Sequence, residues 1–149
     1  MIQQATSVPP ELYEEDETAW LELTAEVIAQ RRFADLDVEH LREYLLDMAR
    51  RDKREVFNRL VTLLAHLLKW EHQKDHRSNS WRGTIIAQRR ELEGLLESGS
   101  LRRHAAEILD RAYKRAIEQA AAETGLPLQT FPPNPTSTLD DMLGGQPLA

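Results

Sequence analysis

Apolar residues recur at every third or fourth position along most of this chain, the spacing of one face of an α-helix. The first such segment covers about residues 16–32, with acidic residues at its start, where the helix dipole favours them. A second helix is capped by Asp37 and ends near Arg51. Three further helices are predicted over about residues 52–71, 80–97 and 101–124.

The segment 52–71 is the most apolar of the five. On a helical projection its apolar side chains fill half of the circumference, which is wider than a surface helix needs. This predicts a central helix that several others contact. Asp52 and Glu55 have the spacing of a capping box and indicate a break near Arg51, although one long helix across this point is the alternative.

The two ends of the chain differ from the middle. Residues 1–13 contain Pro9 and Pro10 and are predicted to be a flexible arm, whereas five of the seven prolines fall in 126–149. We expect the tail, 126–149, to pack on a helical bundle formed by 14–125, with 80–97 and 101–124 as an antiparallel hairpin.

Composition supports this interpretation. The 149 residues include 22 Leu and 16 Ala but only 5 Val and 6 Ile, which favours helix over strand. The predicted fold class is therefore all-α, a single bundle of about five helices.

Charge is distributed unevenly. The net charge of −6 is the sum of an acidic N-terminal part, a basic centre and an acidic tail. Residues 50–90 contain eleven basic and four acidic residues, so the net charge of this stretch is +7. Such a stretch is typical of a surface for nucleic acid or an anionic ligand, but an acidic helix lying across it would also explain it, and we favour that explanation.

The densest group of chemically versatile side chains falls in 66–90. Its members are His66, Lys69, Trp70, Arg77, Trp81, Arg82, Arg89 and Arg90. Arginines beside a helix N-terminus can hold a phosphate or carboxylate, and the specific hypothesis is an anion site of Arg77, Arg82 and the amides near Trp81. The alternative, which we favour, is a structural corner in which Trp70 and Trp81 pack together.

Catalysis has little support in the sequence. Without cysteine there is no thiolate nucleophile or thiolate metal site, and no serine motif or glycine-rich phosphate loop is present. His72 and His76 have helical metal-ligand spacing but lack a third ligand, so we predict no metal site and no cofactor. We assign no catalytic residue; an enzyme centred on His66 and Arg82 is retained as an alternative.

Several motifs in order resemble a known family. They are LLAHLLKW at 63–70, SWR at 80–82, QRR at 88–90 and ETGLPLQTFP at 123–132. Together with Asp16, Trp20 and FADLDVEHL they resemble the bacterial family catalogued as domain of unknown function, family 29, over about 13–145. The resemblance implies an all-helical domain without an established activity, and it marks the 66–90 group as a hallmark.

The sequence therefore favours a non-catalytic interaction module that binds another protein or itself. Nucleic-acid or anionic-ligand binding through 50–90 is the alternative. No apolar run is long enough to cross a membrane, and the start of the chain lacks a signal-peptide pattern, so a cytoplasmic location is expected.

Overall fold

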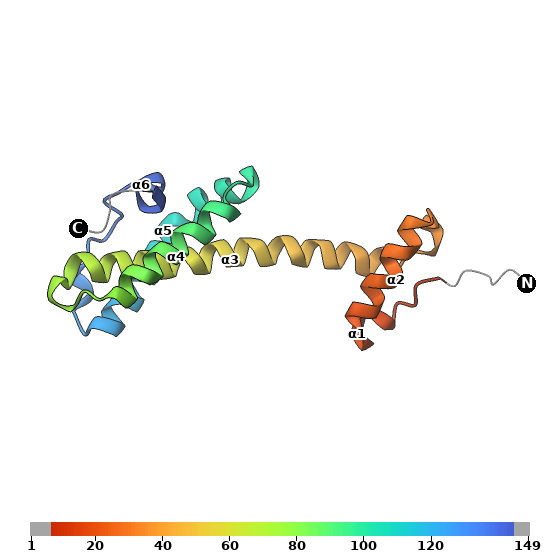
Figure 1. Cartoon of the computed structure of the whole chain (residues 1–149), viewed down its shortest axis with the longest axis horizontal. Coiled ribbons are helices and arrows are strands. Elements are labelled where there is room, and N and C mark those ends of the chain that lie inside the picture. The colour runs from red at the N-terminus through yellow and green to blue at the C-terminus, as the bar shows by residue number, and fades with distance from the viewer. Residues whose placement is uncertain (1–6, 145–149) are drawn as a thin grey trace, which may run out of the picture. The chain divides into compact units, whose positions relative to one another are not determined.

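The computed structural model describes residues 7–144, and every regular element in that range is helical (Figure 1). The fold class is all-α, as predicted. The chain divides into two compact units, residues 1–50 (unit 1) and 51–149 (unit 2). The helices are α1 (Leu12–Glu15), α2 (Glu17–Ala29), α3 (Val38–His72), α4 (Asn79–Leu95), α5 (Gly99–Thr124) and α6 (Leu139–Gly144).

Helix α3 corrects the predicted break near Arg51. It continues without interruption from Val38 to His72, so the segments predicted as two helices are one. Residues 49–54 contain neither Gly nor Pro, and the helix therefore has no reason to stop there. Glu55 does not reach back to form a capping box and instead accepts a hydrogen bond from Arg59 one turn later.

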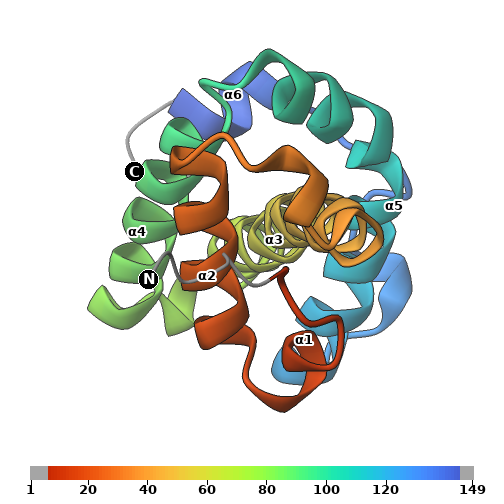
Figure 2. The same cartoon turned by 90° about the vertical axis from the view of Figure 1, so that its right-hand side faces the viewer.

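Unit 1 is formed by α1, α2, a 3-10 turn at Phe33–Asp35 and the start of α3 (Figure 2). Asp16 caps α2 by accepting a hydrogen bond from the N–H of Ala19. Trp20 and Val27 are fully buried in its core. Part of the predicted N-terminal arm joins this core, because Val8 is buried and its N–H donates to the Asp35 carbonyl. Residues 1–6 of that arm lie outside the described range.

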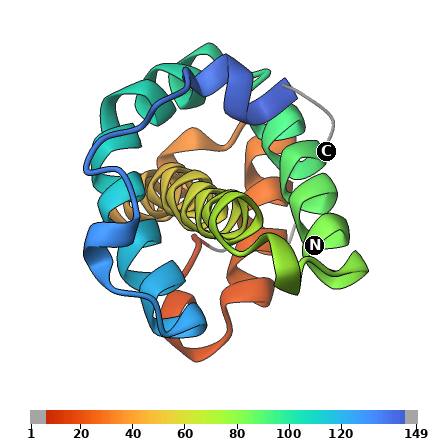
Figure 3. The same ribbon diagram turned by 90° about the vertical axis from the view of Figure 1, so that its left-hand side faces the viewer.

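Unit 2 packs α4 and α5 on either side of the C-terminal half of α3 (Figure 3). One apolar cluster joins Leu60 and Leu63 of α3 to Leu92 of α4 and Ala112 of α5. This confirms the central position predicted for the 52–71 segment.

The α4–α5 hairpin begins and ends close to the predicted positions. Ser78 caps α4, because its extended backbone lets its side chain accept from the N–H of Trp81. Ser98 caps α5 in the same way, one turn after α4 ends. Gly125, with φ of 76°, ends α5 in the left-handed conformation that glycine adopts without strain.

The proline-rich segment is tied to α4 and α5 at several points. Phe131 and Met142 are buried in the unit 2 core. Tyr113 Oη donates to the Pro132 carbonyl at 2.7 Å, and Arg89 Nε donates to the Met142 carbonyl at 2.8 Å. These bonds hold the segment through α6; residues 145–149 of the predicted tail lie outside the described range.

Candidate anion-binding site

The turn from α3 to α4 brings together part of the group that the sequence singled out. Helix α3 ends at His72, a 3-10 turn follows at Lys74–His76, and Ser78 starts α4. Trp70, in the last turn of α3, is buried, and its carbonyl accepts a hydrogen bond of 2.8 Å from Arg77 Nε. The connection is thereby folded back onto the end of α3.

Two guanidinium groups lie over the Trp70 ring. Their Cζ atoms are 4.7 Å (Arg77) and 5.4 Å (Arg82) from the ring centroid, within the range of cation–π attraction. They border a cavity of about 410 Å³, which we call the Trp70 hollow. It is lined by Trp70, Arg77, Ser78, Asn79 and Arg82. This described lining holds two positive charges and no carboxylate.

The N-terminus of α4 adds to this positive potential. The first backbone N–H groups of a helix lack carbonyl partners within the helix, and the dipole gives that end a partial positive charge. The first turn of this 17-residue helix carries no acidic side chain that would neutralise it. Two guanidiniums and the start of α4 therefore converge on the same hollow.

Lys69 and Trp81 serve another purpose. Lys69 is buried, and its Nζ forms an ion pair with Glu123 Oε2 at 2.6 Å while lying 5.0 Å from the centroid of the Trp81 ring. Burial raises the pKa of Glu123, but hydrogen bonds from Lys69 and Gln119 outweigh it and leave that pKa lowered. This cluster joins α3 to both α4 and α5.

His66 lies beside that cluster. Its Nδ1 is 2.8 Å from the Thr62 carbonyl, the geometry of an Nδ1–H donor. Burial lowers the pKa of His66, partly opposed by the bond to Thr62, and the Lys69 charge lowers it further. His66 does not line the Trp70 hollow, so the hollow does not unite it with Arg82 as the enzyme alternative requires.

The last two arginines of the group also separate. Arg89 donates to the Met142 carbonyl and so holds α6, whereas Arg90 is exposed and does not line this hollow. Of the eight residues singled out, Trp70, Arg77 and Arg82 line the hollow together.

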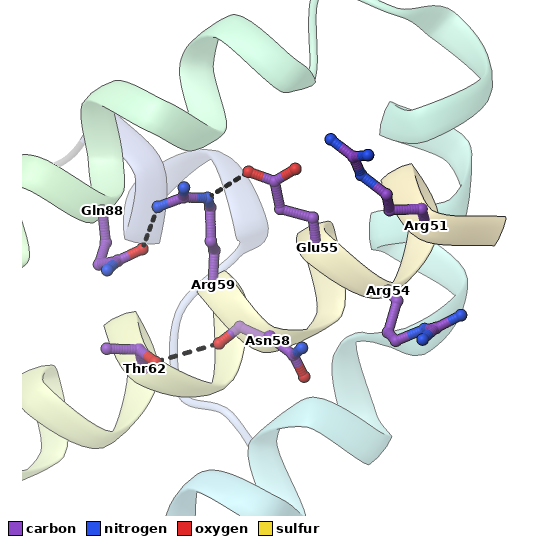
Figure 4. Close-up of a pocket in the computed structure, with 7 residues that line it drawn as sticks. All are labelled: Arg51, Arg54, Glu55, Asn58, Arg59, Thr62 and Gln88. Carbon is purple, nitrogen blue, oxygen red and sulfur yellow. Dashed lines mark hydrogen bonds and ion pairs between the residues drawn. The ribbon is translucent and has the colours of Figure 1, made fainter. Parts of the chain in front are cut away.

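A second hollow lies between α3 and α4 (Figure 4). This cavity of about 340 Å³, the α3 groove, is lined by Arg51, Arg54, Glu55, Asn58, Arg59, Thr62 and Gln88. Arg59 donates to Glu55 at 2.9 Å and to Gln88 at 3.2 Å, and Glu91 approaches it at 3.9 Å. Arg51 and Arg54 extend from the preceding turns of α3.

Sequence reasoning noted the charge of this region but missed the groove. The α3 residues follow a spacing of three and four, which places them on one helical face. The predicted break near Arg51 separated Arg51 from the other α3 residues of the groove. Because α3 is continuous, Arg51 lies on the same helical face as they do.

The two histidines with metal-ligand spacing do not share a helical face. The helix ends at His72, so His76 is not on the same helical face, and the His72 ring packs edge-on against Phe131. Within residues 7–144, no three histidine, aspartate or glutamate side chains are grouped so that they could hold a metal ion. No helix in that range is long and apolar enough to cross a membrane.

Of three comparisons with known proteins, the one with family models gives a match. Neither the curated proteins nor the solved structures include a significant match to this chain. Residues 12–146, which contain both hollows, match the family model described as "Domain of unknown function DUF29". The match covers most of the sequence, and the chain therefore belongs to the DUF29 family.

Proposed function

We propose that this protein is a binding module that holds an anionic group of its partner, a phosphate or a carboxylate, in the Trp70 hollow. The observation that carries the proposal is the pair of guanidiniums over Trp70 at the start of α4. Guanidinium forks match the oxygens of phosphate and carboxylate, and an anion at a helix N-terminus is stabilised by the dipole.

The site is organised before a ligand arrives. Trp70 is fixed in the core, and stacking on its ring restricts the two arginine side chains that would otherwise sample many rotamers. Arg77 is held further by its bond to the Trp70 carbonyl. Less conformational entropy is then lost when an anion binds.

The structural-corner interpretation is compatible with this geometry, since the same contacts also fix the turn. It predicts that Arg82 matters only for stability. The binding proposal rests on the convergence of two guanidiniums with the first turn of α4, because fixing the turn does not require both arginines to lie at a helix N-terminus.

Titration with pyrophosphate, followed by tryptophan fluorescence or by NMR, tests the proposal. We expect saturable binding that Arg82→Ala weakens about tenfold or more, the effect of losing one charge-assisted hydrogen bond. Arg90→Ala is the matched control, because Arg90 is exposed on the same helix outside the hollow. The proposal is wrong if pyrophosphate does not bind, or if both variants weaken binding equally while remaining folded.

Self-association is a second candidate, favoured by unit 1. Val38, Leu41, Leu45 and Met48 follow the alternating three- and four-residue spacing of a coiled-coil seam, and Leu41 also contacts the unit 1 core. Val38 and Leu45 remain 62% and 60% exposed. Two copies could pack these seams together, and light scattering should then detect a dimer that Leu45→Glu converts to a monomer. A monomeric wild-type chain at high concentration would exclude this candidate.

A further inference from the structure

The α3 groove has a different lining from the Trp70 hollow. Its lining contains three guanidiniums and one carboxylate, with the amides of Asn58 and Gln88 and the hydroxyl of Thr62. The Arg54 side chain points away from Glu55 (Figure 4), and Glu91 lies 3.9 Å from Arg59. Arg59 is held by Glu55 and Gln88, whereas Arg51 and Arg54 are exposed (Figure 4). The groove therefore keeps excess positive charge after its internal ion pair is formed.

The lining also indicates which kind of anion would fit. No described lining residue is aromatic or aliphatic, so the groove offers no surface on which a base would stack or an apolar side chain would bury. It offers charged donors for phosphate and neutral donors for the ester and ring oxygens of the sugars. These are the groups of a sugar–phosphate backbone.

The two hollows belong to the same unit and use the same pair of helices. Trp70 and Asn58 are both on α3, separated by twelve residues, which is about 18 Å along the helix axis. Stacked nucleotides rise about 3.4 Å each, so a strand needs about five steps to bridge that distance. A repeating polyanion could reach both hollows, whereas a single phosphate could not.

We infer that the Trp70 hollow and the α3 groove together bind the phosphodiester backbone of one nucleic-acid strand. This rests on the proposed anion-binding function and adds to it the ligand class and a second site. A strand presents phosphates at regular intervals, and binding through Arg51, Arg54, Arg77 and Arg82 requires no contact with the bases. Recognition is therefore independent of sequence.

The test measures binding of fluorescent oligothymidylates of about 3, 6 and 12 nucleotides over a range of salt concentrations. We expect the 12-mer to bind at least tenfold more tightly than the 3-mer. Arg51→Ala/Arg54→Ala should remove most of that gain and reduce the slope of log K against log salt by about 1.4, since each phosphate contact on a single strand contributes about 0.7.

A charge-matched control separates the groove from net charge. Lys53→Ala/Arg90→Ala also removes two exposed positive charges from α3 and α4, but neither residue lines the groove or the hollow. It should leave the length dependence intact. Pyrophosphate affinity at the Trp70 hollow should be unchanged in Arg51→Ala/Arg54→Ala.

The outcomes distinguish the two proposals. If pyrophosphate binds through Arg82 but the groove variant behaves like its control, the nucleic-acid inference is wrong and the anion-binding function stands. An oligoglutamate of equal charge that binds more tightly through Arg51 and Arg54 would also overturn the inference. If Arg82→Ala leaves oligonucleotide affinity unchanged, the strand does not use both hollows and the inference is wrong. If pyrophosphate does not bind, the proposed function is wrong.

Discussion

The two units each bury a charged side chain beside a tryptophan, but the charges have opposite signs. In unit 1 the carboxylate of Asp37 accepts a hydrogen bond of 3.1 Å from Trp20 Nε1 and lies 2.6 Å from His40 Nδ1. In unit 2 the ammonium of Lys69 lies over the face of Trp81 and pairs with Glu123. The polar edge of an indole thus serves an anion and its π-face serves a cation.

The difference predicts opposite responses to pH. The hydrogen bond to Asp37 raises the pKa of His40, so unit 1 is stabilised by a proton. Burial lowers the pKa of His66, and hydrogen bonds from Lys69 and Gln119 lower that of Glu123, so unit 2 is stabilised by deprotonated groups. Four predictions test this contrast.

The largest effect is expected from Asp37→Ala. It leaves the buried Trp20 Nε1 and His40 without their shared acceptor, and it removes a carboxylate near the N–H of His40 at the start of α3. We expect unit 1 to lose about 3 kcal/mol. Hydrogen exchange should accelerate in α2 and remain unchanged in α5; equal acceleration in both would contradict separate buried-charge sites.

Lys69→Met should have the next largest effect, about 2 kcal/mol in unit 2, because it leaves Glu123 without its cation. The double variant Lys69→Met/Glu123→Gln should recover much of this loss, since replacing both partners removes the uncompensated charge. Denaturant unfolding measures both. Failure of the second substitution to restore stability would show that Lys69 acts through Trp81 instead.

A smaller effect, about 1 kcal/mol, is expected from Ser78→Ala, which removes the side-chain cap of α4. Unlike Asp37, Ser78 is exposed, so no buried donor loses its partner. Ser98→Ala, which removes the corresponding cap of α5, is the control. Both variants should have similar stability, but only Ser78→Ala should disturb pyrophosphate binding.

The pH dependence should be the most gradual effect. His40 stabilises unit 1 fully below pH 6.5, and this contribution is lost as the pH rises through its raised pKa. His66 destabilises unit 2 as the pH falls below 6.5, and Glu123 does so below 4.5. Protection factors in α2 and α5, which compare each exchange rate with the intrinsic rate at the same pH, should therefore change in opposite directions with pH. His40→Gln should remove the response of α2 alone.

Periodicity predicted the helices well because it reports which face of each segment is buried. In the segment 16–32 Trp20 and Val27, seven residues apart, are both buried, whereas Ile28, next to Val27, is exposed. The D-x-x-E signal at Asp52 was misleading, because a capping box requires the N-cap residue itself to be non-helical and Asp52 lies inside α3.

The candidate site was less accessible to sequence reasoning. Arg77 and Arg82 were named together, but their shared position over Trp70 depends on how the turn after α3 folds. In the sequence Lys69 is as good a candidate for anion binding as Arg77 and Arg82. Its charge is neutralised by Glu123, which is 54 residues away, so no local pattern reveals the pair. The groove needed a continuous α3 and a contribution from Gln88.

The uninterrupted course of α3 through residues 50–54 has a consequence for proteolysis. Arg50, Arg51, Lys53 and Arg54 form a dense run of trypsin sites on exposed helix. Proteases cleave extended chain, so a helix resists them until it opens locally. The rate of cutting at this run therefore reports how often the middle of α3 unwinds. A nucleic-acid strand that occupies Arg51 and Arg54 would be detected as protection from trypsin.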